Sequence, residues 1–152
     1  MSEIKIIARN KKAFFNYNIS EKIEAGIQLL GTEVKSIKTK GASLIDSYAK
    51  FDKKGELYVH NMHIPKYDFG NLMNHDPLRR RKLLLHKREL LKLKKMQERE
   101  SYIIVPLTLY VKKGIIKLEL GVGKSKRKFD KREAIKKREA QRKIESSLKF
   151  KK

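Results

Sequence analysis

The last 29 residues, 124–152, constrain this chain most, because they cannot build a hydrophobic core. They carry fourteen Lys or Arg against four Asp or Glu and few large apolar side chains. A segment of such high net charge repels itself in water, so it stays extended or loosely helical until a polyanion neutralises it. We therefore predict a folded body over residues 1–123 and a basic tail over residues 124–152 that is disordered when free.

The positive charge is not confined to the tail. The whole chain has a net charge of +22, and residues 1–123 alone hold 25 basic and 13 acidic side chains. Solubility alone is served by a net charge of about 2 to 8 in a small domain. This excess indicates a polyanionic partner, of which nucleic acid is the first candidate and an anionic membrane surface the second.

Length and cysteine content limit the remaining possibilities. The body is long enough for one domain and too short for two. The chain has no Cys, which excludes disulfides, thiolate zinc sites and Cys nucleophiles and is typical of a reducing compartment, so we expect a cytoplasmic protein. The apolar run at the N-terminus is too short for a signal peptide, and no stretch approaches the length of a membrane span.

In the first third of the body, short elements alternate with glycines. The aromatic-rich residues 13–19 predict a strand that runs into a short helix capped by Ser20, and Gly26 lets the chain redirect. Residues 27–30 read as a second strand, closed by Gly31. Thr32 is placed to cap a short helix over residues 33–38, which Gly41 would end.

Two hairpins and one long helix are expected in the rest of the body. Alternating runs at 47–51 and 56–60 flank a Gly-containing loop, and runs at 102–111 and 115–120 flank another, with Pro106 marking an edge or a bulge. Residues 64–77 lack a period and predict a loop, whereas the leucine spacing over residues 78–100 predicts the longest helix.

These elements predict a mainly β fold with helices. Several short antiparallel strands would expose their edges unless they closed on one another. We therefore expect an OB-like antiparallel β-barrel with one long and two short helices, followed by the basic tail.

Five motifs, in one order along nearly the whole chain, resemble the family of small protein B, the SsrA-binding proteins. They read EAG at 24–26, GTEVKS at 31–36, DSY at 46–48, DP at 76–77 with RKLLLHKRE at 81–89, and GV at 121–122 leading to DKR at 130–132. A basic barrel alone would match many RNA-binding modules, but this combination is far more specific.

The resemblance implies an RNA-binding protein without enzymatic activity or cofactor. Members of this family bind the tRNA-like domain of transfer-messenger RNA (SsrA RNA) and deliver it to stalled ribosomes for trans-translation. The implied partners are this RNA, the small-subunit ribosomal RNA at the decoding centre, and elongation factor Tu in the delivery complex. The body grips the RNA elbow, and the tail becomes helical in the empty messenger channel.

The resemblance also assigns RNA contacts on the body, each with a structural alternative. The amide of Asn10 and the ammonium groups of Lys11 and Lys12 would contact RNA, or these three residues would form a solvated turn. Tyr17 would stack on a base or pack in the core, and Lys35 would contact phosphate or lie on a solvated helix face. Leu84 would contact RNA or be a core residue, and His86 would contact RNA or be a solvated helix residue. The expected RNA-binding residues are Asn10, Lys11, Lys12, Tyr17, Glu24, Lys35, Leu84 and His86.

Glu24 is unusual on a surface that faces phosphate, because a bare carboxylate repels it. This side chain must accept hydrogen bonds from a base edge or anchor a nearby Lys or Arg. The resemblance favours a role at the RNA surface.

Further motif residues link the body to the tail and are expected to bind the ribosome: Lys124, Lys126, Arg127, Phe129, Asp130, Lys131 and Arg132. Phe129 stands where the family usually has His or Tyr, so it keeps a stacking face and loses a hydrogen bond. Asp130 and Glu133 can form a capping pair for a helix. That helix has no continuous apolar stripe, so it has little reason to form alone.

Other functions have weaker support in the sequence. A ribosomal protein or general RNA chaperone is the alternative that charge alone favours. A nuclease would need carboxylates and histidines arranged around a metal, yet His60 and His63 point to opposite faces of a predicted strand and no third ligand is evident. No metal site and no catalytic residue are expected.

Overall fold

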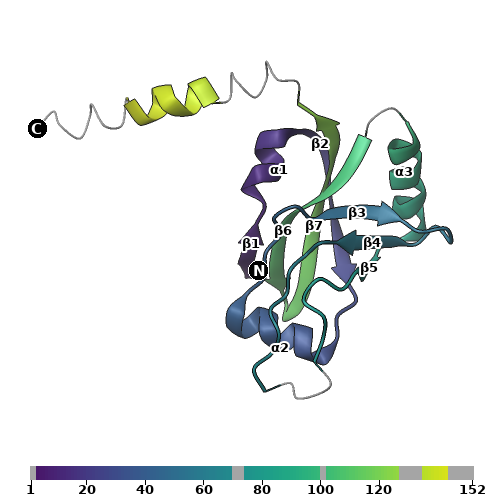
Figure 1. Cartoon of the computed structure of the whole chain (residues 1–152). Coiled ribbons are helices and arrows are strands. Elements are labelled where there is room, and N and C mark those ends of the chain that lie inside the picture. The colour runs from purple at the N-terminus through teal and green to yellow at the C-terminus, as the bar shows by residue number, and fades with distance from the viewer. Residues whose placement is uncertain (1–2, 70–73, 100–101, 127–134, 144–152) are drawn as a thin grey trace, which may run out of the picture.

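Antiparallel strands closed into a ring dominate the structure, a computed structural model that describes residues 3–69, 74–99, 102–126 and 135–143 (Figure 1). Seven strands lie in the order β1-β6-β3-β4-β5-β2-β7, and a further pairing of β6 with β7 closes the ring. The predicted mainly β fold with a closed antiparallel arrangement is confirmed. The strands are β1 (Ile4–Arg9), β2 (Tyr17–Ile27), β3 (Tyr48–Phe51), β4 (Leu57–His60), β5 (Arg81–Leu84), β6 (Tyr102–Lys112) and β7 (Ile115–Ser125).

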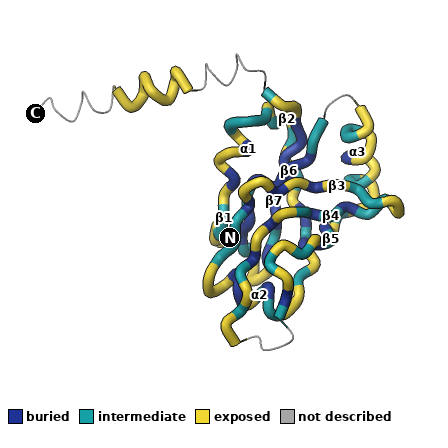
Figure 2. Tube along the Cα trace, viewed as in Figure 1, coloured by how far each residue is buried: buried dark blue, intermediate teal, exposed yellow. Residues whose placement is uncertain are grey.

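Alternation along the strands separates the core from the surface. In β7, Leu118, Leu120 and Val122 are fully buried, while Lys117 and Glu119, on either side of Leu118, face outward. Side chains with a period of two line opposite faces of a strand, so one face of each strand supplies the core. Figure 2 shows the buried positions concentrated on the ring strands.

β6 is the strand on which the ring depends, because it pairs with three others. It runs beside β7 from Tyr102 to Lys112, and its other edge is shared between β3 near Ile104 and β1 from Thr108 onward. A register shift between Pro106 and Thr108 separates the two halves, which confirms the predicted bulge. The pairing of β1, a strand that the sequence did not predict, covers an edge that would otherwise be exposed.

A second, smaller cluster lies on the outside of the ring, under α1 (Lys11–Asn16). It contains Ala13 from the helix with Val105 and Leu107 from β6. A Cβ on Gly121 would lie 2.6 Å from Leu107 Cδ1, so only glycine leaves room for this leucine. Gly123 is more tightly constrained, because a Cβ there would lie still closer to the backbone oxygen of Asn18.

Two predicted elements are wrong in type. Residues 13–16 belong to α1 rather than to a strand, because the Asn10 side chain accepts a hydrogen bond from Ala13 N and starts a helix; Ser20 lies within β2. Residues 81–84 form β5 rather than helix, so the predicted long helix shortens to α3 (Lys87–Glu98). Three leucines in a row fit either period, and pairing with β2 and β4 decides for the strand.

Other predictions hold with shifted bounds. α2 (Gly31–Lys40) includes Gly31, which was expected to close a strand, and Leu30 rather than Thr32 occupies the cap position. Leu30 N donates to Glu33 Oε1 at 2.8 Å, and Gly41 ends the helix. The hairpin of β3 and β4 and the hairpin of β6 and β7 are confirmed, and β7 reaches Ser125, two residues beyond the predicted body.

A buried ion pair connects α2 to the ring. Glu33 and Arg81 are both fully buried, and Arg81 Nε lies 2.5 Å from Glu33 Oε2. Arg81 Nη1 also donates to Met62 O at 2.5 Å, and Arg79 Nη2 lies 2.5 Å from Glu33 Oε1. Burial by itself raises the pKa of the Glu33 carboxyl, but the hydrogen bonds from Arg79 and Leu30 and the charge of Arg81 hold this pKa below its ordinary value.

Neutralising Glu33 should therefore destabilise the body strongly. In Glu33→Gln the Arg81 guanidinium stays buried without a counter-charge, and we expect a loss of about 3–5 kcal/mol in the free energy of unfolding. Urea unfolding followed by circular dichroism measures this loss. Glu56→Gln is the matched control, because the Glu56–Lys82 pair is partly exposed, with side chains 39% and 35% accessible, and should cost at most about 1 kcal/mol. Equal losses in the two variants would contradict the role of the buried pair.

Candidate nucleic-acid interface

Glu24 and Leu84 lie close together on the outer face of the ring, although 60 positions separate them in the sequence. β2 pairs with β5 through Gly26 and Leu84, and a Cβ on Gly26 would lie 3.2 Å from Leu84 Cβ. Leu84 is 50% exposed, because its neighbours Leu83 and Arg81 take the inward positions of the strand. The structure therefore excludes the core alternative for Leu84 and brings the two predicted residues to one surface.

Tyr110 and Lys112 of β6 hold the Glu24 carboxylate. The Tyr110 hydroxyl donates to Glu24 Oε2, and Lys112 Nζ lies 3.6 Å from the same oxygen. The hydrogen bond from Tyr110 lowers the pKa of the Glu24 carboxyl below its ordinary value, and the charges of Lys112 and Lys117 add to it against the opposing effect of burial. Burial, with the hydrogen bond to Glu24, raises the pKa of Tyr110. Glu24 is thus an ionised acceptor fixed in position.

His86 lies just beyond this face. It occupies the N-cap position of α3, is exposed, and its backbone N donates to Glu89 Oε1 at 3.2 Å. The imidazole of His86 is accessible at the start of a helix whose exposed side chains are largely basic. The prediction that His86 stands inside a helix is wrong, but its exposure keeps it available to a ligand.

Asn10 is buried, unlike Lys11 and Lys12, which were predicted to contact RNA together with it. It is 5% exposed, and its Nδ2 donates to Pro106 O at 2.9 Å and to Leu44 O at 3.2 Å. Its Oδ1 accepts from Ala13 N at 3.1 Å. These bonds occupy both ends of the amide and tie α1 to the ring. Lys11 and Lys12 follow on the exposed first turn, with Lys12 Nζ 3.4 Å from Asp46 Oδ1.

Tyr17 and Lys35 are not near Glu24 in the ring. Tyr17 is half-buried where α1 meets β2 and packs against the small outer cluster. Lys35 is exposed on α2, with its Nζ 5.7 Å from the Tyr67 ring centre. The predicted body residues thus occupy three places: the outer face of β2 and β5, the α1 region, and α2.

Only the first residues of the predicted tail site are described. Lys124 is exposed in β7 with its Nζ 4.8 Å from the Tyr102 ring centre, and Lys126 N donates to Asn16 O at 2.8 Å. Residues 135–143 are helical and exposed throughout, and Arg138 lies over the Phe15 ring at 5.3 Å. The remaining predicted tail residues lie outside the described part of the chain: Arg127, Phe129, Asp130, Lys131 and Arg132.

The described residues hold neither a metal-ligand cluster nor a membrane-spanning helix. Within those ranges, no group of three or more His, Cys, Asp or Glu is placed to hold a metal ion. No helix there is long and apolar enough to cross a membrane.

The sequence did not single out Tyr110 as a functional residue. Its signal is alternation: Tyr110 shares the outward face of β6 with Lys112. β7 lies between β6 and the Glu24 strand, and the Tyr110 side chain reaches Glu24 across it. Such a contact becomes visible only when the order of strands around the ring is known.

Comparison with known proteins settles the family. A family model described as SmpB protein matches residues 7–150. This chain belongs to the SmpB family. The resemblance drawn from its five motifs is confirmed.

Similar proteins span almost the full chain. The SsrA-binding protein of Anoxybacillus flavithermus is 56% identical over 146 residues, which cover 96% of this chain and 94% of that protein. The SsrA-binding protein of Borreliella burgdorferi is 49% identical over 151 residues, or 99% and 100% of the two chains. Among solved structures, a chain reported under "tmRNA-SmpB: a journey to the center of the bacterial ribosome" is 42% identical, with a TM-score of 0.66, and the match covers 84% of this chain and 93% of that one.

Removing the Tyr110 hydroxyl should raise the pKa of Glu24. Tyr110→Phe deletes the donor, so an NMR titration of the glutamate carboxyl carbons should show the Glu24 pKa closer to its ordinary value of about 4.3. Because the folded-state pKa is depressed, the stabilisation from this contact is present above that value and is lost as the pH falls through the folded-state pKa. The wild type should therefore lose its stability advantage over the variant upon acidification.

Tyr58→Phe is the control for this titration, because the Tyr58 hydroxyl donates to Glu56 Oε2 at 3.2 Å rather than to Glu24. It should leave the Glu24 titration unchanged. An unshifted Glu24 pKa in Tyr110→Phe would show that the hydroxyl does not set the state of the carboxylate.

Proposed function

We propose that this protein binds the tRNA-like domain of transfer-messenger RNA and delivers it to stalled ribosomes for trans-translation. It acts in the cytoplasm as an adaptor and carries out no covalent chemistry. Its partners are transfer-messenger RNA, the ribosome with its small-subunit RNA at the decoding centre, and elongation factor Tu in the delivery complex. The full-length similarity to SsrA-binding proteins carries this proposal.

The outer face of β2 and β5 supports the RNA-binding part. It offers an ionised acceptor at Glu24, an exposed apolar side chain at Leu84 and an exposed imidazole at His86. RNA that is recognised by shape and by unpaired bases presents base-edge donors and stacking faces to such groups. Lys11, Lys12 and Lys35 supply phosphate contacts around the body, and Asn10 holds α1 where two of those lysines project.

The tail has a separate role in this proposal. Residues 127–152 would enter the empty messenger channel, where ribosomal RNA neutralises their charge and stabilises a helix. Phe129 would stack on a base there, with Arg127, Asp130, Lys131 and Arg132 beside it. The helical residues 135–143 are exposed, and the Arg138 guanidinium over the Phe15 ring is a surface contact that ribosomal RNA would replace.

Substitutions on the outer face should weaken recognition of the tRNA-like domain. We expect Glu24→Gln combined with Leu84→Ala to lower its affinity by about 30- to 1,000-fold, since each of the two lost contacts is worth roughly 1–2 kcal/mol. Filter binding at one fixed salt concentration, in an excess of ordinary tRNA, measures this change. Glu56→Gln serves as the charge-matched control.

The same competition separates the adaptor from a general RNA chaperone. Phosphate contacts alone give salt-sensitive binding without discrimination. If ordinary tRNA competes as well as the tRNA-like domain against the wild type, the adaptor function is wrong.

Truncation should separate the two activities. Because β7 continues to Ser125 and Lys126 bonds to α1, the chain should be cut after Lys126 so that the ring stays intact. We expect affinity for the tRNA-like domain to stay within a few-fold while peptide tagging on stalled ribosomes is abolished. Parallel loss of both activities, with unchanged thermal unfolding, would refute the division of labour between body and tail.

A further inference from the structure

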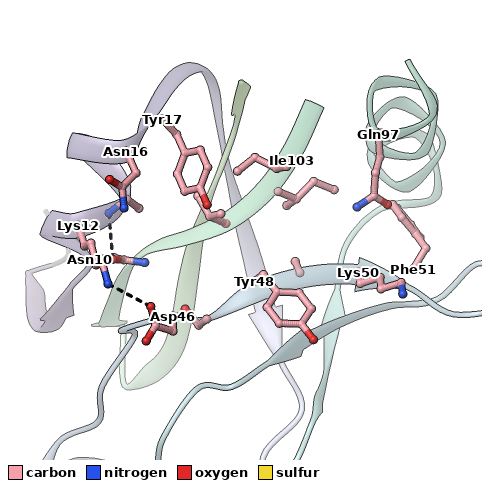
Figure 3. Close-up of a pocket in the computed structure, with 15 residues that line it drawn as sticks. Asn10, Lys12, Asn16, Tyr17, Asp46, Tyr48, Lys50, Phe51, Gln97 and Ile103 are labelled. Atoms are coloured by element: carbon pink, nitrogen blue, oxygen red, sulfur yellow. Dashed lines mark hydrogen bonds and ion pairs between the residues drawn. The ribbon is translucent and has the colours of Figure 1, made fainter. Parts of the chain in front are cut away.

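A cleft on the side of the ring away from Glu24 is not part of the outer face described above, although Asn10, Lys12 and Tyr17 of the expected RNA-binding residues line it. It has a volume of about 490 Å³ and lies between α1, β3 and α3, with β6 behind it (Figure 3). This volume falls within the range of small-ligand sites, roughly 300–1,000 Å³. In the ring order, β3 is separated from β2 by two strands in either direction, so the cleft and the Glu24 face look away from each other.

Aromatic side chains line the cleft from different elements. Tyr17 points into it from the start of β2, and Tyr48 and Phe51 line it from β3 (Figure 3). Tyr48 is 42% exposed, and its ring stacks on His60 with centroids 5.1 Å apart and planes at 9°. A ring fixed from one side in this way is a ready surface for a flat ligand on the other.

Amide and ammonium groups complete the lining. Among the described residues, no hydrogen-bond partner is present for the side-chain amides of Asn16 and Gln97, which lie on opposite sides of the cleft. Lys12 and Lys50 stand at the rim. The partner of Lys12, Asp46, is 71% exposed, and such a surface pair contributes so little that a phosphate can replace it.

We propose that this cleft binds one unpaired nucleotide of an RNA, with its base stacked on Tyr48, its edge read by Gln97 and Asn16, and its phosphate held by Lys12 and Lys50. The inference rests on the proposed function only in taking RNA as the ligand. Stacking faces, amides and cations are the three groups that a single nucleotide needs. An acidic peptide would pair with the lysines but would leave the stacking face and the amides unmatched.

Further aromatic and cationic side chains lie on the surface beyond Tyr48. On the outer face of β4, the Tyr58 ring lies under the Arg80 guanidinium at 4.3 Å, next to Lys82 of β5. These cations can receive the phosphates that flank an inserted nucleotide. The positive surround also favours RNA over a neutral ligand.

Binding of a fluorescent oligonucleotide tests the proposal. A single-stranded hexaribonucleotide carrying one 2-aminopurine is titrated with the full chain at about 0.15 M salt, where exposed charges are largely screened. Stacking should quench the fluorescence in a saturable way. Tyr48→Ala should weaken binding roughly 5- to 100-fold, Tyr48→Phe should stay within a few-fold of wild type, and Gln97→Leu should reduce preference among bases.

Phe69→Ala is the matched control, because this aromatic ring is 80% exposed and does not line the cleft. It should bind as the wild type does. The proposal is overturned if Tyr48→Ala binds the oligonucleotide like wild type, or if Phe69→Ala loses as much affinity as Tyr48→Ala does. Either result would mean that the oligonucleotide is attracted by charge alone. Thermal unfolding of each variant confirms that the ring is intact.

A second titration, with the tRNA-like domain already bound, identifies the source of the nucleotide. If the hexaribonucleotide is still quenched, the cleft takes its nucleotide from another RNA, such as that of the ribosome. If it is displaced and Tyr48→Ala lowers the affinity for the tRNA-like domain, the nucleotide belongs to that domain. Both outcomes support the cleft, whereas failure of the proposed function would appear separately, as equal competition by ordinary tRNA.

Discussion

The buried pair of Glu33 and Arg81 is the interaction on which the rest of the structure depends. Arg81 takes an inward position of β5 that alternation would otherwise give to an apolar residue, and its guanidinium reaches Glu33 on α2 and the carbonyl of Met62. A buried, hydrogen-bonded ion pair is costly to break, although it adds little net stability over an apolar core. Its structural effect is to join α2, the segment before β5 and the ring in one fixed arrangement.

That arrangement places the outward residues of β5. With Arg81 and Leu83 turned inward, Leu84 is forced outward against Gly26, beside Glu24. A shift of β5 by one residue would bury Leu84 and expose Arg81, because side chains alternate along a strand. The charged pair disfavours such a shift, since it would leave Glu33 buried without its partner. The geometry of the outer face thus follows from a contact inside the ring.

The sequence predicted the class of the fold, both hairpins and the bulge at Pro106, because each depends on local alternation and turn residues. It missed β1, whose order comes from pairing with β6, and it took β5 for helix, because RKLLL has no period that distinguishes the two. It also read residues 13–16 as a strand, since the bonds that hold the Asn10 amide in its capping position are donated to Leu44 and Pro106, far along the chain. Family resemblance singled out Glu24 and Leu84 as candidate RNA contacts, whereas the positions of Tyr110 and of the cleft beside Tyr48 depend on strand order, which local patterns do not encode.

The placement of carboxylates shows how such a basic chain can still be selective. Glu24 and Glu119 lie directly opposite each other on β2 and β7, an arrangement that ordinarily destabilises a sheet. The hydrogen bond from Tyr110, together with the charges of Lys112 and Lys117, lowers the pKa of Glu24 and so keeps it charged at neutral pH. A surface built only to attract phosphate would gain nothing from these acceptors, whereas base edges and ribose hydroxyls present donors that they can match. Under the proposed function, positive charge supplies attraction from a distance, and fixed carboxylates such as Glu24 supply discrimination at contact.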